Sequence, residues 1–112
     1  MQIELLVPDL MAYSRLRHAF ATAAAELEEM PGALLVVDVG PMAALGWEKA
    51  IRRAQANSVR VIAFGPHSMA PRLAACRRLG VDVVAVNSEM LTDPVAVVRR
   101  LTAEPLDPQA TT

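Results

Sequence analysis

Residues 33–39, Ala-Leu-Leu-Val-Val-Asp-Val, form an almost uninterrupted apolar run. A run of this length without alternation is typical of a strand that is buried on both faces of a parallel sheet. Two comparable valine-rich runs follow at residues 59–64 and 81–86. We therefore expect three strands of the same kind, each covered by helices on both faces.

A further strand is expected ahead of these three, near the start of the chain. Ile3, Leu5 and Val7 share one face of it, while Gln2 and Glu4 point to the other face. Alternation of this kind indicates that one face is less buried than the other. The pattern predicts a strand at the edge of the sheet.

Helical patterns fill the intervals between the four runs. The expected helices run from Leu10 to about Glu28, from Met42 or Ala43 to Ala56, from after Ser68 to just before Gly80, and from Asp93-Pro94 onward. Asp9 is suited to cap the first helix, and Gly80 to end the third. A strand followed by a helix, repeated four times, predicts a parallel sheet with right-handed connections.

Composition limits the class of protein. The 112 residues fit one domain, and a hydrophobic share of 54% is enough for a core, so we predict a domain over residues 1–104 and a flexible tail over residues 105–112. A net charge of -1 argues against direct binding of nucleic acid or membrane. Cys76 is the only cysteine and the first residues lack a basic signal-peptide segment, which favours a cytoplasmic location.

Open parallel sheets carry their functional groups where the strands end on the carboxyl side. The residues expected at that edge are Pro8 and Asp9, Asp38 to Pro41, Gly65 to Ser68, and Asn87 to Glu89. The sequence contains no phosphate-binding glycine motif, no cobalamin pattern and no zinc-ligand spacing.

In their order, these strand ends resemble the receiver domain of bacterial two-component response regulators. Leu34-Leu35-Val36-Val37-Asp38, followed by a proline and a glycine, resembles the segment that ends in the phospho-accepting aspartate. Residues 61–65 resemble the strand that ends in Ser or Thr, and residues 79–88 the segment that ends in Lys-Pro. The resemblance covers about residues 3–102 and implies an α/β fold, a flavodoxin-like or receiver-like three-layer sandwich.

The departures from the receiver pattern are chemical. Receivers hold a divalent metal, usually Mg²⁺, with an acidic pair, but here that pair reads Pro8-Asp9. Gly65 stands where the family has a hydroxyl, and Asn87 where it has a lysine. Lys49, the only lysine, is expected a turn or more away from the edge. The chain thus resembles a pseudo-receiver that keeps the acceptor aspartate and lacks most of the phosphate-binding groups.

A second departure is architectural. Only 29 positions separate Asp9 from Asp38, which leaves room for one parallel crossover and not two. The prediction is a four-stranded parallel sheet that lacks one strand-helix unit, the second strand and second helix of a receiver. The first strand then has an exposed edge, which is a candidate dimer seam. Two strand orders stay open, first-second-third-fourth or one with the second strand outside the first.

These observations predict a non-catalytic receiver-like regulatory or protein-interaction module, with a protein partner and a homodimer as one such pairing. It is expected to need no cofactor and not to be phosphorylated in the standard way. One alternative is a working receiver that accepts a phosphoryl group on Asp38, with Mg²⁺ held by Asp9 and Asp38. Competing with these roles, Asp38 can bond the backbone of the next loop and Asp9 can be an ordinary helix cap.

Another alternative is a module that binds a small ligand or an anion at the carboxyl edge of the sheet. Its candidate residues are Gly65, His67 and Ser68, which lead into a helix whose N–H groups attract anions, and Asn87, which ends the fourth strand at the same edge. The competing interpretation of the first three is a simple turn in which Ser68 caps the following helix.

Overall fold

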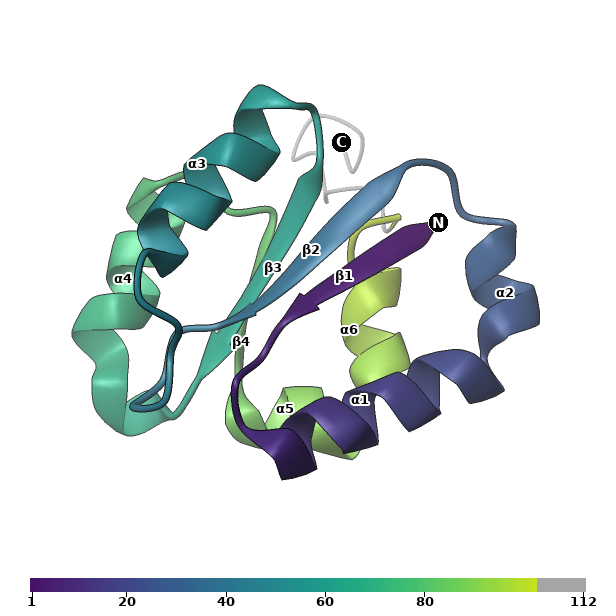
Figure 1. Cartoon of the computed structure of the whole chain (residues 1–112), viewed down its shortest axis with the longest axis horizontal. Coiled ribbons are helices and arrows are strands. Elements are labelled where there is room, and N and C mark those ends of the chain that lie inside the picture. Colours follow the sequence, from purple (N-terminus) through teal and green to yellow (C-terminus); the bar gives the residue numbers. More distant parts are fainter. Residues whose placement is uncertain (103–112) are drawn as a thin grey trace, which may run out of the picture.

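Four parallel strands form one sheet in the computed structural model, which describes residues 1–102 (Figure 1). The strands are β1 (Gln2–Leu6), β2 (Ala33–Asp38), β3 (Arg60–Gly65) and β4 (Val83–Val86). Their spatial order is β1-β2-β3-β4, and every neighbouring pair is parallel. The predicted parallel sheet is confirmed, and the order is the one in which the second strand lies between the first and the third.

Helices lie on both faces of this sheet. They are α1 (Leu10–Thr22), α2 (Ala24–Glu28), α3 (Trp47–Ala56), the 3-10 turn η1 (His67–Met69), α4 (Ala70–Arg78), α5 (Asn87–Thr92) and α6 (Pro94–Arg99). Figure 1 shows α1, α2, α5 and α6 on one side of the strands and α3 and α4 on the other.

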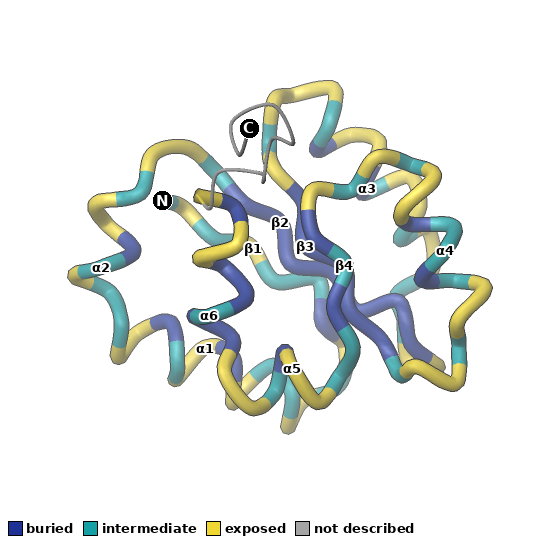
Figure 2. The backbone as a smooth tube through the Cα atoms, turned by 180° about the vertical axis from the view of Figure 1, so that it is seen from behind, coloured by how far each residue is buried: buried dark blue, intermediate teal, exposed yellow. Residues whose placement is uncertain are grey.

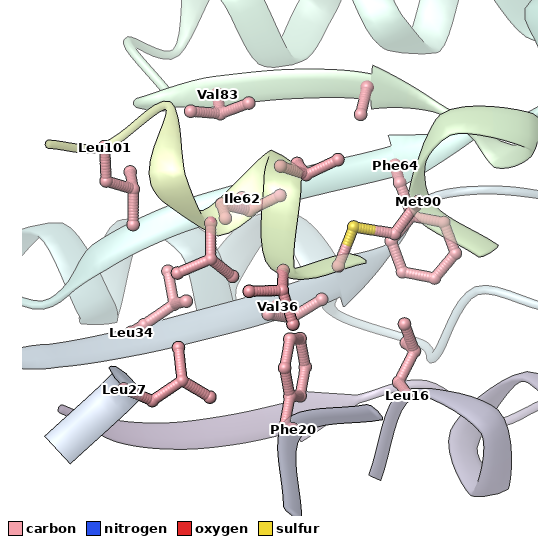
Figure 3. Close-up of a cluster of buried hydrophobic side chains, with 14 of the residues drawn as sticks. Leu16, Phe20, Leu27, Leu34, Val36, Ile62, Phe64, Val83, Met90 and Leu101 are labelled. Carbon is pink, nitrogen blue, oxygen red and sulfur yellow. The ribbon is translucent and has the colours of Figure 1, made fainter. Parts of the chain in front are cut away.

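The core has two halves because the central strands send side chains to both faces. Leu34 and Val36 of β2 point into a cluster with α1, α2, α5 and α6, part of which Figure 3 shows around Phe64 and Met90. Leu35 and Val37 point the other way, into a cluster with α3 and α4. Both faces of β2 and β3 are therefore buried, which explains their continuous apolar sequence (Figure 2).

The first predicted helix is in fact two. α1 ends at Thr22, Ala23 leaves the helical conformation with φ -97° and ψ 19°, and α2 begins at Ala24. No proline or glycine marks this break. The break lets Leu27 of α2 join Leu16 and Phe20 of α1 in the same cluster, so packing rather than local sequence accounts for it.

Two other helix starts differ from the expected positions. α3 begins at Trp47 rather than near Met42, because Gly46 has a φ of 78° that is incompatible with a right-handed helix. Ser68 lies inside the 3-10 turn and does not cap α4, whose first flanking residue, Met69, makes no side-chain bond to the helix. The predicted cap at Ser68 is therefore wrong.

The short helix α5 is absent from the sequence prediction. It begins directly at the end of β4, and its single fully buried side chain is Met90. A one-turn helix offers too few apolar positions to show a helical period. Glu89 stabilises its start by accepting a hydrogen bond from the Val86 amide at 3.1 Å.

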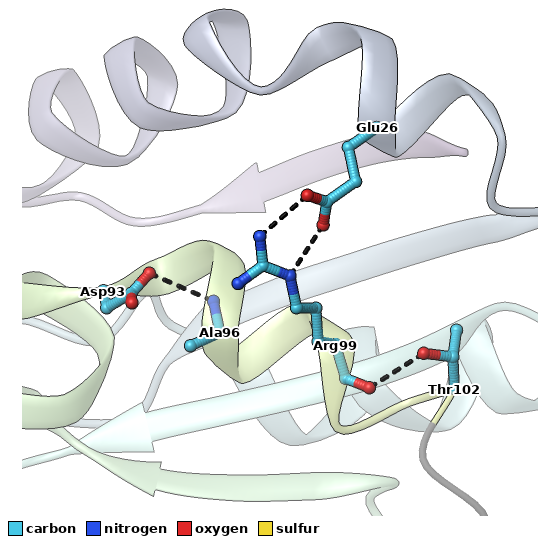
Figure 4. A network of polar contacts seen from close by, with 5 residues as sticks. All are labelled: Glu26, Asp93, Ala96, Arg99 and Thr102. Carbon is cyan, nitrogen blue, oxygen red and sulfur yellow. Dashed lines mark hydrogen bonds and ion pairs between the residues drawn. The ribbon is translucent and has the colours of Figure 1, made fainter.

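Polar contacts are found at both ends of the last helix. Asp93 caps α6 by accepting a hydrogen bond from the Ala96 amide at 3.1 Å, as the Asp93-Pro94 pair predicts. Arg99 then forms a two-pronged ion pair with Glu26 of α2, at 2.8 and 2.7 Å (Figure 4). This pair joins segments 73 residues apart, although both side chains are solvent-exposed enough for the pair to add little stability.

The connection from β1 to β2 has the opposite hand to the two connections that follow. The sheet advances in one direction from β1 to β4, yet α1 and α2 lie on one face while α3 and α4 lie on the other. A helix that changes face without a change of direction reverses the hand of its connection. In Figure 1, where β1 is nearest the viewer, the connection through α1 is the left-handed one, so the expectation of right-handed connections throughout is wrong between β1 and β2.

The remaining expectations for the chain ends fall outside the structure. The predicted tail, residues 105–112, and the end of the predicted domain lie beyond the described residues 1–102. Within the described part, no helix combines the length and apolar character needed to span a bilayer.

Candidate functional site

Asp38 is the centre of the carboxyl edge. It ends β2 and is 8% exposed, and it is the one buried charged or polar side chain within residues 1–102. The Gly40 amide donates a hydrogen bond of 2.7 Å to its Oδ1 atom. Burial raises the pKa of Asp38 above its usual value, the Gly40 bond opposes that shift, and the nearby charge of Asp9 adds to it. The predicted bond to the next loop is confirmed.

Asp9 lies close enough to Asp38 for its charge to be felt there, but it has a separate structural task. It caps α1, because its Oδ1 accepts hydrogen bonds from the amides of Met11 at 2.9 Å and Ala12 at 3.2 Å. The predicted cap is confirmed. The two carboxylates that were the metal candidates are thus neighbours, and each is bonded to backbone amides.

The loop after Asp38 packs tightly against the end of β3. A Cβ atom added to Gly40 would lie 3.0 Å from Asp38 Oδ1 and 3.1 Å from Pro66 Cδ. Gly65 is less crowded, since a Cβ atom there would meet its nearest neighbour, Val39 Cγ2, at 3.4 Å. A side chain is therefore harder to fit at position 40 than at position 65.

Arg72 is a residue of this site that the sequence analysis does not single out. From the first turn of α4 its Nη1 atom donates hydrogen bonds to the carbonyl oxygens of Val39, at 3.1 Å, and Gly40, at 2.9 Å. Its guanidinium forms no ion pair with a carboxylate of the described residues. In the sequence, the one indication of this role is that Arg72 lies in the first turn of the helix that follows β3.

The other candidate residues stand apart from Asp38. His67 and Ser68 are exposed in η1, and Asn87 is half-buried at the start of α5. None of these three side chains makes a hydrogen bond to another described residue of the chain. Lys49 is exposed on α3. The structure thus brings Asp9, Asp38 and Gly65 to one edge of the sheet. The side chains that were candidates for binding an anion do not join them.

The charged groups nearest the end of β2 are engaged in hydrogen bonds to the backbone. Within residues 1–102 no three His, Cys, Asp or Glu side chains gather as metal ligands. The buried carboxylate is bonded to the Gly40 amide, and the nearby guanidinium of Arg72 is bonded to two carbonyl oxygens. The arrangement fixes the loop between β2 and α3 in place. Comparison of the chain with protein-family models, with curated proteins and with solved structures found no match.

Proposed function

We propose that this chain is a receiver-like regulatory module that binds protein and does not hold a phosphoryl group. One observation carries the proposal: Asp38 is buried with its Oδ1 atom on the Gly40 amide, while Arg72 directs its Nη1 atom to two carbonyl oxygens of the same loop and forms no ion pair with a carboxylate of the described residues. An aspartate held in this way stabilises the loop, and no cation of the described residues is paired with its carboxylate.

The chemistry of phosphoryl transfer supports this proposal. Charge on the transferring group has to be neutralised by cations and hydrogen-bond donors that are already in place. Here Gly65 has no hydroxyl to offer, Asn87 has no charge, and Asp9 uses one carboxylate oxygen on two helix amides. The groups present favour a fixed surface over a covalent switch.

The hand of the first connection supports a receiver-like origin for the fold. The resemblance places the second strand of a receiver outside the first, so that the chain passes over α1 to the outer edge and then returns over the opposite face. Removing that strand and the following helix leaves α1 on its original face and sends the chain directly to β2. A connection of reversed hand, followed by two of the usual hand, is what such a deletion would leave.

The proposal is tested by exposing the folded protein to acetyl phosphate and Mg²⁺ and measuring its intact mass. We expect no phosphoryl adduct, and the same spectrum from the Asp38→Asn variant. An adduct on the natural sequence that disappears in Asp38→Asn would establish the phospho-accepting alternative and overturn our proposal. A parallel titration with inorganic phosphate, followed by amide NMR shifts at His67, Ser68 and Asn87, tests the anion-binding alternative.

A further inference from the structure

β1 has one side without a neighbour in the described chain (Figure 1). The Gln2 amide donates to the Gly32 carbonyl at 3.0 Å, so the backbone groups of Gln2, Glu4 and Leu6 face β2. Because these groups alternate along a strand, the N–H and C=O groups of Ile3 and Leu5 point outward. The strand is regular and lacks a bulge, proline or lysine, and Glu4 is its one charged side chain.

Concave surfaces flank this edge on both faces of the sheet. On the face of α1, a groove runs along Ile3, Glu4 and Leu5 and is closed by Tyr13, Arg17 and Phe20. On the opposite face, a second groove lies between β1 and α3. The reversed connection explains the second groove, because no described segment crosses that face outside β1. The bare edge therefore comes with recesses above and below it.

The groove beside α3 is complementary to itself in charge. Its lining includes one acid, Glu4 of β1, and one base, Arg53 of α3, set among the apolar side chains of Leu6, Leu35 and Ala50. Glu4 and Arg53 are exposed, and neither forms an ion pair with another residue within 1–102. A two-fold axis would bring the acid of each copy toward the base of the other, which a self-complementary interface requires.

We propose that a second copy of this chain pairs with β1, antiparallel, to form a homodimer with one continuous sheet. The inference rests on the proposed function, since it names the partner of the interaction module. A two-fold axis perpendicular to the sheet keeps α1 beside α1 and α3 beside α3, so the recesses on each face join. Glu4 of each copy lies across the joined groove from Arg53 of the other.

Charge also selects the register of the pairing. A register centred on Glu4 would set the two Glu4 side chains directly opposite each other, which is unfavourable. A register centred on Leu5 sets Glu4 opposite Leu6 of the second copy, Leu5 opposite Leu5, and Ile3 opposite Val7, the residue that directly follows β1. We assign the second register to the dimer.

Sedimentation equilibrium over a wide range of protein concentration tests the dimer. We expect Glu4→Arg and Arg53→Glu each to raise the dissociation constant about tenfold or more, because each places like charges across the groove. An equal mixture of the two variants should recover the natural affinity, since each then supplies the charge that the other lacks. Glu29→Arg and Arg52→Glu make the same charge changes at exposed positions outside the grooves, and should leave the dimer unchanged.

Amide hydrogen exchange locates the interface. The outward amides of Ile3 and Leu5 should exchange rapidly at low protein concentration and slowly at high concentration, while the Glu4 amide is protected throughout. A monomer at every concentration would overturn the inference. So would a dimer in which these two amides stay unprotected, or one that Glu4→Arg and Arg53→Glu leave intact. The phosphoryl-adduct measurement does not depend on dimerisation, so the inference and the proposed function can fail separately.

Discussion

Asp38 shows how a single buried side chain at the end of a strand can serve the loop beside it. Its carboxylate is buried, yet it has one short hydrogen bond from Gly40 and a like charge, Asp9, nearby. Burial therefore makes ionisation more costly in the folded chain than in the unfolded chain. The Asp38 carboxyl group therefore contributes most to the free energy of unfolding when it is protonated, and this leads to a pH-dependent prediction.

Asp38→Asn should make the protein more stable at about pH 7, because the amide cannot ionise and still offers an oxygen to Gly40. The raised pKa of Asp38 means that its contribution is fully present below the usual aspartate value of 3.8 and is lost as pH rises through the folded-state pKa. The advantage of the variant should therefore disappear below that pH. Urea midpoints measured across this range check it. A variant less stable than the natural sequence at neutral pH would contradict our account of Asp38.

Gly40 is predicted to be far less tolerant of a side chain than Gly65. Gly40→Ala would push a methyl group to 3.0 Å from Asp38 Oδ1 and 3.1 Å from Pro66 Cδ, and overpacking of this kind costs about 1–3 kcal/mol. Gly65→Ala meets its closest atom at 3.4 Å and should change the free energy of unfolding by less than about 0.5 kcal/mol. Chemical unfolding of both variants makes the comparison, and equal losses would show that the loop is not packed as described.

Helix α1 depends on its cap, since its first turn contains no acidic residue to interact with the helix dipole. Asp9 supplies the acceptor for two of the otherwise unbonded amides. α1 is also the helix that connects β1 to β2, and it lies on the face of the sheet where that connection runs.

Asp9→Ala should cost about 1 kcal/mol through the lost cap, and lower the melting temperature by about 4–8 °C in a domain of this size. Relief of the charge on Asp38 offsets part of that loss. Asp9→Ser keeps a capping oxygen and also removes the charge, so it should be at least as stable as the natural sequence to within a few degrees. Thermal unfolding by circular dichroism measures both, and equal losses in the two variants would argue against the cap.

The complete domain has two helical layers that share one four-stranded sheet. Neither layer can lose its packing without exposing one face of β2 and β3, whose residues are buried on both sides. We therefore expect the two halves of the core to unfold together.

Leu16→Ala tests this coupling from the side of α1. Leu16 is fully buried, and its truncation should cost about 2–5 kcal/mol. Trp47, the only tryptophan, packs on the opposite cluster. Its fluorescence should nevertheless report the same lowered midpoint as circular dichroism. A tryptophan transition that stays at the natural midpoint would show that the layers unfold independently.

Much of this architecture can be predicted from local patterns. The strands can be predicted from short apolar runs. Residues 33–39 and 59–64 are apolar at nearly every position, which is typical of strands that are buried on both faces of a sheet. The caps at Asp9 and Asp93 follow from side chains that bond amides two or three positions away. The bond from Gly40 to Asp38 has the same local origin. Interactions between residues only a few positions apart can be predicted from short sequence patterns.

The hand of the first connection, the helix α5 and the part played by Arg72 depend on packing between distant segments. α1 lies on its face because Leu16 and Phe20 meet residues of β2, α5 and α6 there. Arg72 reaches carbonyls 32 and 33 positions away. These contacts depend on how the helical layers pack on the sheet. A short stretch of sequence does not show that packing. The chain thus specifies its elements and their caps locally, while the face of each helix and the bare edge of β1 arise only when the layers pack together.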